Sequence, residues 1–265
     1  MSRTLVIVPT YDERESLPVT LRQLLKLDRE FDILVVDDDS PDGTGALAER
    51  HATDSSRIHV LHHGARRGLG AAYVAGFGWG LDRGYDRLVQ MDADGSHRPA
   101  DLPRLLDELD AGHDLAVGSR WVPGGRVENW PLARRLLSRA GSAYARLLLG
   151  LPVRDVTGGY RAFTASVLHR VELGSVTSRG YCFQIDLLRR AVRAQADIAE
   201  VPIVFRQRTA GRSKMSSSIV AEALVQVTRW AVRDRPRRRG LDRVSRRHTA
   251  TPRKATAGRV PRLGE

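Results

Sequence analysis

The chain has 265 residues, a formal net charge of +12 and a single cysteine. A lone cysteine excludes an intrachain disulfide and favours a reducing compartment. No apolar stretch approaches the roughly 20 residues that a membrane-spanning helix needs, and no signal-peptide pattern opens the chain. We therefore expect a cytoplasmic protein in which Cys182 serves as a small buried hydrophobic residue.

Most of the positive charge lies near the C-terminus. Residues 233–265 contain twelve Arg or Lys and three acidic residues, which leaves only about +3 on residues 1–232. We expect 1–232 to fold as one domain and 233–265 to form a basic, disordered tail, because the tail has few large apolar residues. Such a tail either solubilises the protein or binds anionic lipid head groups. Nucleic acid is not expected as a partner, because the folded part shows no basic stripe interleaved with aromatic residues.

Strand-like and helix-like segments alternate through the first 120 residues. Apolar runs predict strands at about 4–8, 33–37, 58–62, 87–91 and 114–118. Helical periodicity predicts helices at about 15–26, 44–52, 70–82 and 100–110. Short apolar strands that alternate with helices are typical of an α/β fold. We therefore expect a Rossmann-like, mostly parallel sheet with helices on both faces.

Two amphipathic helices are predicted in the second half of the chain. The first has arginines on one side and an apolar face made of Leu132, Leu136, Leu137, Ala140, Tyr144, Leu147 and Leu148. We expect this face to pack in the core, although a helix lying on a membrane surface would show the same pattern. The last helix, at about 216–232, has an apolar face made of Ile219, Val220, Ala223, Leu224, Val227, Trp230 and Ala231. It leads directly into the basic tail, an arrangement suited to membrane docking.

Three of the predicted strands end in acidic or polar clusters. The first leads into residues 10–15, the second into 37–39 and the fourth into 92–94. Parallel strands place their carboxyl ends at one edge, where ligands of open α/β sheets bind. Two carboxylates one residue apart repel each other unless a cation lies between them, and Mg²⁺ accepts carboxylates together with substrate phosphate oxygens. Asp92 and Asp94 thus predict a metal site for a phosphorylated substrate, with a solvated turn as the alternative.

A series of segments resembles glycosyltransferase family 2. The segments are PTYDERE (9–15), VDDDSPDGT (36–44), DADGSHRP (92–99), GSR (118–120), DVTGGYR (155–161), GYCFQID (180–186), EVPI (200–203) and RTAGRSK (208–214). Within that family the series is similar to the polyprenol (dolichol) monophosphate mannose synthases. The resemblance runs in order from about residue 4 to 232 and excludes the basic tail.

The resemblance implies a GT-A fold and the inverting transfer of mannose from GDP-mannose to a polyprenyl phosphate. Donor-binding roles would fall to Pro9, Tyr11, Glu13, Val36, Asp38, Asp92, Gln184 and Asp186. Asp92 and Asp94 would hold Mg²⁺ or Mn²⁺ on the diphosphate. Ser96 stands where many relatives place a metal-binding Gln, and it would act as a ligand through a water molecule.

The resemblance also implies catalytic roles for Asp94 and four cationic residues. Arg208 and Lys214 match positions that stabilise charge on the leaving diphosphate. Arg120 and Arg134 match positions that bind the acceptor phosphate, for which guanidinium groups are well suited. A phosphate oxygen is already anionic at neutral pH, so such an enzyme requires no general base.

Several supporting roles and partners are expected alongside these. Gln184 and Asp186 would orient sugar hydroxyls or arginine side chains, and Asp155 and Arg161 would form a structural ion pair. His97 would cap or pack near the turn that carries the two aspartates. An acceptor lipid implies peripheral association with the cytoplasmic face of a membrane, with a separate integral membrane protein as a candidate partner.

Three alternatives share parts of this pattern. In the first, the enzyme uses a UDP-sugar such as UDP-glucose as donor, because the aspartates and arginines do not discriminate the base or the sugar. In the second, the acceptor is a hydroxyl group, and Asp186 would have to serve as the base. In the third, the protein is not an enzyme and binds nucleotide, or binds nucleic acid through its basic tail.

Overall fold

The computed structural model describes residues 2–176, 178, 180–207 and 217–234. Two residues with expected catalytic roles, Arg208 and Lys214, lie outside the described residues, as does almost all of the tail expected at 233–265. The last described helix ends at Asp234, two residues beyond the expected end of the folded domain.

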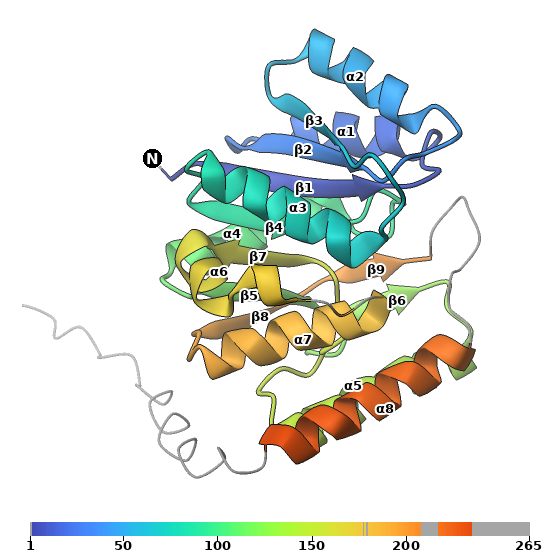
Figure 1. Ribbon diagram of the computed structural model, residues 1–265, viewed down its shortest axis with the longest axis vertical. Helices are drawn as coiled ribbons and strands as arrows, with labels where there is room; N and C mark the ends of the chain where they lie inside the picture. Colours follow the sequence, from blue (N-terminus) through green and yellow to red (C-terminus); the bar gives the residue numbers. More distant parts are fainter. Residues whose placement is uncertain (1, 177, 179, 208–216, 235–265) are drawn as a thin grey trace, which may run out of the picture.

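A seven-stranded sheet in the order β3-β2-β1-β4-β7-β5-β8 forms the centre of the molecule (Figure 1). Its strands are β1 (Thr4–Thr10), β2 (Asp32–Asp37), β3 (Ile58–His62), β4 (Arg87–Gln90), β5 (Leu115–Ser119), β7 (Arg161–Thr164) and β8 (Ile198–Pro202). A separate parallel pair consists of β6 (Arg126–Glu128) and β9 (Val204–Arg206).

The helices are α1 (Leu17–Leu25), α2 (Thr44–Asp54), α3 (Leu69–Asp82), α4 (Leu102–Asp110), α5 (Leu132–Leu149), α6 (Ala165–Val171), α7 (Gly180–Arg193) and α8 (Ser217–Asp234), with short 3-10 turns at Pro99–Asp101 and Leu173–Ser175. The strands and helices predicted for the first 120 residues are all present, with ends shifted by two residues or fewer. The expected mostly parallel sheet is confirmed. Only β7 runs antiparallel to its neighbours β4 and β5.

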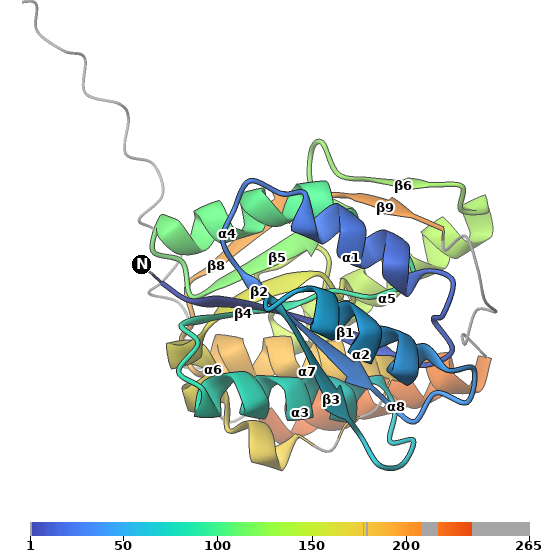
Figure 2. The same ribbon diagram turned by 90° about the horizontal axis from the view of Figure 1, so that it is seen from above.

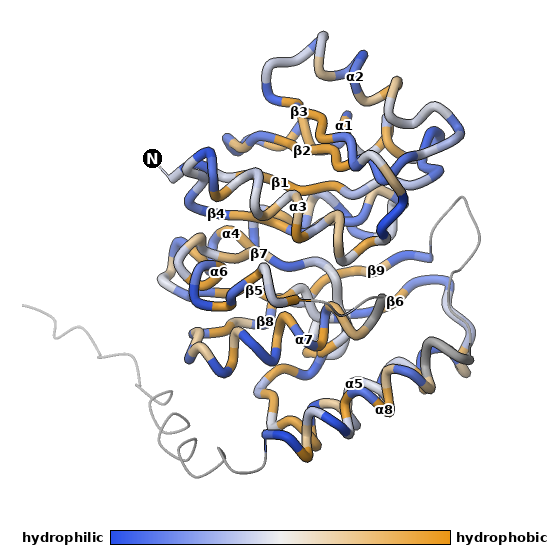
Figure 3. Tube along the Cα trace, in the orientation of Figure 1, coloured by the Kyte–Doolittle hydropathy of each residue, from blue (hydrophilic) through white to orange (hydrophobic). Residues whose placement is uncertain are grey.

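Apolar side chains that alternate along the strands build a core on each face of the sheet. Leu5 and Ile7 of β1 belong to the core under α3, α6 and α7. Val6 and Val8 belong to the core under α1, α2 and α4. Figure 2 shows the two helical layers on opposite sides of the sheet, and Figure 3 shows the apolar strands between them. A Cβ atom on Gly76 would lie 2.5 Å from Ile7 Cγ2, so glycine permits the close approach of α3 to β1.

The expected core packing of the α5 apolar face holds for Tyr144 and Leu148, which are partly buried against the core, and is wrong for its other leucines. Leu132, Leu136 and Leu147 are 68%, 59% and 72% exposed. The reason is the place of α5 in the fold. The sheet face nearest to α5 is already covered by α6 and α7, and α5 lies beside α8 at the end of the molecule (Figure 1). The predicted apolar face of α8 is divided, because Val227 and Trp230 are buried whereas Leu224 is exposed.

The carboxyl ends of the parallel strands meet at one edge, as expected. Thr10, the last residue of β1, lies opposite Asp37, the last residue of β2. The antiparallel strand β7 begins at this same edge, where Arg161 pairs in register with Gln90 of β4 and Val117 of β5. The sequence segments that carry polar motifs are therefore brought together by the sheet.

Candidate active site

Asp92 and Asp94 follow β4 in a tight turn at the carboxyl edge of the sheet. Gly95 has a φ of 75°, which glycine adopts without strain. Asp94 is buried and its Oδ1 accepts a hydrogen bond from the Ser96 amide at 3.0 Å. The Asp92 side chain is 29% exposed. The turn thus presents one partly open carboxylate beside one buried carboxylate.

The residues around this turn fit a hard divalent cation. The Oγ atom of Ser96 and the Oε1 atom of Gln184 are buried, and in the described part of the chain neither has a hydrogen-bond partner. A Cβ atom on Gly159 would lie 3.5 Å from Gln184 Nε2 and 3.9 Å from Asp92 Oδ2, so the amide and the carboxylate both border this glycine. The described residues contain no cluster of three or more His, Cys, Asp or Glu that would hold a metal alone. Mg²⁺ or Mn²⁺ would therefore need substrate oxygens in addition to the aspartates.

His97 packs beside the turn, as predicted. Its Nδ1 accepts a hydrogen bond from the Asp92 amide at 3.0 Å, which leaves it unavailable as a metal ligand through that atom. The ring is buried, with its centroid 4.9 Å from that of Tyr160 and 5.5 Å from that of Phe205. His97 therefore supports the backbone of the turn.

The five residues predicted to contact the nucleoside lie on or after β1 and β2. Pro9 is buried in β1, and Tyr11 and Glu13 follow that strand. The Val36 side chain is buried in the core under α3, so a contact with a nucleoside would have to come from its backbone.

The structure adds Arg66, which sequence reasoning missed, beside Tyr11. Its Cζ atom lies 3.9 Å from the Tyr11 ring centroid, and its Nη1 donates to the phenol oxygen at 3.2 Å. An arginine stacked on an aromatic ring carries no signal in the sequence at a separation of 55 residues.

Asp38 organises the loop between β3 and α3. Its carboxylate accepts hydrogen bonds from the amides of Arg67 and Gly68, at 2.9 and 2.7 Å, and pairs with His63 Nδ1 at 3.0 Å. Gly68 has a φ of 90°, which orients its amide toward the carboxylate at little cost. Burial disfavours the charge of Asp38, but these hydrogen bonds outweigh it and lower its pKa. Asp38, which is predicted to contact the donor, therefore also holds the loop between β3 and α3 in place.

Arg120 is held by Asp155, which corrects the expected ion pair between Asp155 and Arg161. Arg120 Nε and Nη2 donate to the two carboxylate oxygens of Asp155 at 2.7 and 2.6 Å, and Nη2 also donates to Thr157 Oγ1 at 3.0 Å. Arg161 instead donates to the carbonyl oxygens of Gln184 and Val156, at 2.7 and 2.8 Å, and burial lowers its pKa to about 10. Asp155 pairs with Arg120 because the guanidinium of Arg161 is directed to the two carbonyl oxygens, whereas that of Arg120 reaches both carboxylate oxygens.

Trp130 brings the two expected acceptor arginines together. Its ring centroid lies 5.5 Å from Arg120 Cζ and 4.1 Å from Arg134 Cζ. Phe205 adds an edge-on contact to Trp130 at 5.4 Å. Stacking on an aromatic face stabilises a guanidinium cation by about 0.5–2 kcal/mol. Arg120 comes from the end of β5 and Arg134 from the first turn of α5, so their proximity is a product of the fold.

Asp186 lies among arginines. Its oxygens accept hydrogen bonds from Arg189 Nη1 at 3.0 Å, Arg190 Nε at 3.2 Å and Ser178 Oγ at 3.2 Å. This agrees with the expectation that Asp186 orients arginine side chains. Cys182 is buried, and burial raises its pKa to about 11, so the expectation of a small hydrophobic residue is confirmed.

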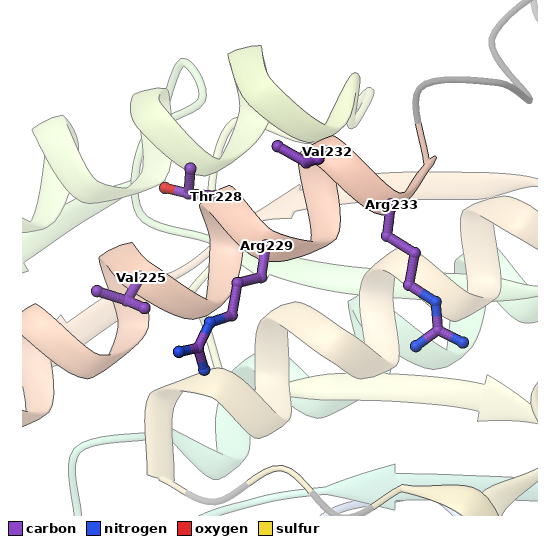
Figure 4. A pocket seen from close by; sticks show the side chains of 5 residues that line it. All are labelled: Val225, Thr228, Arg229, Val232 and Arg233. Atoms are coloured by element: carbon purple, nitrogen blue, oxygen red, sulfur yellow. The ribbon is translucent and has the colours of Figure 1, made fainter.

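A pocket of about 470 Å³ lies on α8, away from the aspartate turn (Figure 4). Its lining consists of Val225, Thr228, Arg229, Val232 and Arg233. Apolar groups and arginines therefore alternate along this exposed side of the helix. Among the described residues no helix is both long and apolar enough to cross a bilayer.

Comparison with known proteins places these features in a family. The pattern described as glycosyl transferase family 2 matches residues 5–171. The chain is 54% identical over 243 residues to the polyprenol monophosphomannose synthase of Mycolicibacterium smegmatis, covering 91% of this chain and 92% of that relative. It is also 54% identical over 230 residues to the undecaprenyl-phosphate mannosyltransferase of Micrococcus luteus, covering 87% of this chain and 94% of that relative.

Solved structures of lower identity share the fold. Glucosyl-3-phosphoglycerate synthase from Mycobacterium tuberculosis, solved with Mn²⁺, UDP-glucose and glycerol 3-phosphate, is 20% identical with a TM-score of 0.62, covering 87% of this chain and 80% of that one. A mannosyltransferase from Pyrobaculum calidifontis, solved with GDP-mannose and Mn²⁺, is 21% identical with a TM-score of 0.59, covering 88% and 64%. The expected GT-A fold is confirmed. Because the family pattern covers more than half of the chain and two relatives share 54% of its residues over most of their length, the chain belongs to glycosyltransferase family 2.

Proposed function

We propose that this protein transfers mannose from GDP-mannose to a polyprenyl monophosphate and inverts the anomeric configuration. The observation that carries the proposal is the pairing of two features at one sheet edge. One is the Asp92–Asp94 turn after β4, and the other is the pair of arginines, Arg120 and Arg134, gathered on Trp130. The names of the two relatives at 54% identity support the same donor sugar and acceptor class.

The transfer breaks the bond between the sugar and the diphosphate and leaves negative charge on GDP. A bound Mg²⁺ or Mn²⁺ supplies Lewis-acid stabilisation of that charge. Asp92 and Asp94 would hold the ion, with Ser96 beside it. Arg208 and Lys214, expected to stabilise the same charge, lie outside the described residues and stay part of the proposal.

The acceptor phosphate brings its own negative charge as the nucleophile. Arg120 and Arg134 would bind it, and the rigid bond of Arg120 to Asp155 would fix its direction of attack. Both carboxylate oxygens of Asp186 are held by arginines, Arg189 and Arg190, an arrangement that suits an orienting group better than a general base. This observation supports a phosphate acceptor over a hydroxyl acceptor.

The α5–α8 pair is the part of the molecule that we propose binds an anionic bilayer. The exposed leucines of α5 face outward together with Arg135 and Arg139, and α8 adds Leu224, Val225 and Val232 beside its own arginines. Such a face suits the boundary between acyl chains and anionic head groups. Arg134 lies in the first turn of α5, so a lipid phosphate drawn from that surface would meet the acceptor arginines directly. The basic tail would add attraction at the cytoplasmic leaflet, and an integral membrane protein is a further candidate partner.

A radiolabel transfer assay tests the reaction. GDP-mannose, UDP-glucose and UDP-N-acetylglucosamine are supplied in turn with a polyprenyl phosphate and Mg²⁺ or Mn²⁺. We expect lipid-linked product from GDP-mannose alone, and none with Asp94→Ala. Product from a UDP-sugar would overturn the donor, whereas transfer only to a hydroxyl acceptor would overturn the acceptor.

Vesicle flotation tests the membrane surface separately. The full chain should bind vesicles that contain anionic lipid, and Leu136→Gln should weaken binding about tenfold, because it removes one large apolar side chain from the interface. Val19→Gln is the matched control, since Val19 is 48% exposed on α1, a different face of the molecule. Equal binding by the two variants would remove α5 from the membrane surface.

A further inference from the structure

Tyr73 makes a buried hydrogen bond to one of the two aspartates of the turn. Its phenol oxygen donates to Asp92 Oδ1 at 2.9 Å. The ring is fully buried, stacks parallel to Phe183 at 6.1 Å between centroids, and lies 6.3 Å from Phe77. Packing on two sides fixes the ring, so the position of the phenol oxygen is set by the core.

The chemistry of the phenol makes this bond one-directional. A tyrosine phenol has one proton to donate, and its hydroxyl lies 2.9 Å from Asp92 Oδ1. Toward an oxygen of the carboxylate it therefore acts as the donor. Among the described residues no hydrogen bond reaches Asp92 Oδ2, and His97 Nδ1, which accepts the Asp92 amide, lies 3.9 Å from it.

Two contacts on opposite sides thus set the direction of Asp92. His97 accepts the backbone amide of Asp92, and Tyr73 holds Oδ1 of its side chain. The carboxylate plane is restrained, and Oδ2 is left as the oxygen without a protein hydrogen bond in the described part of the chain. Outer groups that orient a ligand in this way typically change metal affinity by about 10- to 100-fold.

The helix that carries Tyr73 is itself anchored at both ends of the candidate site. The amide of Gly68, at its N-terminus, donates to Asp38, and Gly76 packs closely on Ile7 of β1. The segment joins the nucleoside side of the site, at Asp38, to the metal side, at Asp92. Tyr73 is the point at which this helix touches the aspartate turn.

We propose that Tyr73 is the positioning residue for Asp92, which orients that carboxylate for the divalent ion and the donor diphosphate. The proposal rests on the metal site of the proposed function. It assigns Tyr73 no contact with substrate. Its effect is on the affinity for metal in the presence of nucleotide, and through that on the donor.

Tyr73→Phe removes the hydroxyl and keeps the packed ring. The matched control is Tyr85→Phe, because Tyr85 is also buried and donates to a carboxylate, Asp32 Oδ2, at 2.6 Å. Asp32 begins β2, at the amino end of the parallel strands, so this second phenol–carboxylate bond lies at the opposite edge of the sheet. The two variants delete the same chemical bond at two edges of one sheet.

The measurement is Mn²⁺ binding by electron paramagnetic resonance, with GDP present and with melting temperature recorded for each protein. We expect Tyr73→Phe to weaken Mn²⁺ binding at least about tenfold and Tyr85→Phe to leave it unchanged. Excess Mn²⁺ should restore most of the turnover of Tyr73→Phe, which a general structural defect would not allow. Equal Mn²⁺ affinity in Tyr73→Phe and wild type would overturn the positioning role while the metal site stands. No Mn²⁺ binding by wild type would overturn the metal site and the inference with it.

Discussion

The carboxyl edge of the sheet and the α5–α8 pair use apolar and charged residues in opposite ways. At the sheet edge, charged groups are buried and paired, as Arg120 is with Asp155 and Asp38 is with two backbone amides. On α5 four leucines, Leu132, Leu136, Leu137 and Leu147, are exposed, and only Ser142 and Ala145 of this helix are fully buried.

This contrast separates two kinds of restraint. The sheet edge is fixed by hydrogen bonds that each buried charge requires, so its geometry is set before any ligand arrives. The outer helices gain little from burial within the chain and are suited to a surface outside it. Substitutions should therefore alter folding stability and chemistry at the sheet edge, and association at the outer helices.

The largest effect should follow from Asp155→Asn. The change removes the counter-charge of Arg120, whose side chain is 6% exposed, and a buried arginine without its partner costs about 3–5 kcal/mol of the free energy of unfolding. Chemical denaturation measures the difference. Glu128→Gln, which breaks a surface pair with Arg206, is the control and should cost far less, because solvent screens an exposed ion pair. A loss at Asp155 as small as that at Glu128 would mean that water reaches Arg120 freely.

Arg134→Ala should raise the KM for polyprenyl phosphate about 10- to 100-fold, because a hydrogen bond to a charged group contributes about 1.5–3 kcal/mol. The KM for GDP-mannose should stay within about twofold, because the proposed role of Arg134 is to bind the acceptor phosphate. Arg135→Ala, one residue further along α5 and exposed, is the matched control. An equal rise in both KM values would place Arg134 at the donor and break the division between the two regions.

The sequence predicted the sheet edge well because its signals are local. Apolar runs and acidic strand ends located β1, β2 and β4, and parallel pairing then placed their ends side by side. Asp92 and Asp94 needed no long-range information to be chosen. Of their two supports, His97 lies only five residues from Asp92 and was predicted, whereas Tyr73 comes from α3 and was not.

The sequence did not separate a core helix from a surface helix. The leucine spacing of α5 is the same for both, and the outcome depended on whether a sheet face remained uncovered. The predicted ion-pair partner of Asp155 was wrong for a similar reason. Asp155 and Arg161 lie six residues apart in the sequence. The fold instead places the guanidinium group of Arg120, 35 residues away in the sequence, within hydrogen-bond distance of Asp155. The exposure of α5 and the partner of Asp155 are therefore set by the tertiary structure.

Asp38 should make the stability of the sheet edge depend on pH in the acid range. Its pKa is lowered in the folded state, so its ionised form contributes stability above the unfolded pKa of about 3.9. That contribution is lost as pH falls through the folded pKa. Asp38→Asn should therefore be less stable than wild type at pH 5, and the difference should narrow below about pH 4. Urea midpoints across this range test it, with the exposed Asp39→Asn as control. A stability difference that stays constant with pH would show that the charge of Asp38 does not contribute to stability.

The smallest effect should come from Leu136→Gln in the absence of membranes. Leu136 is 59% exposed, so the free energy of unfolding should change by less than about 0.5 kcal/mol. Leu88→Ala, at a fully buried position of strand β4, should cost about 2–5 kcal/mol under the same conditions. Together with the vesicle assay, the pair distinguishes an apolar residue kept for folding from one kept for association. A loss near that of Leu88 would show that α5 is covered in solution, as by a second copy of the chain. Sedimentation at several protein concentrations would then identify that cover, because only self-association depends on concentration.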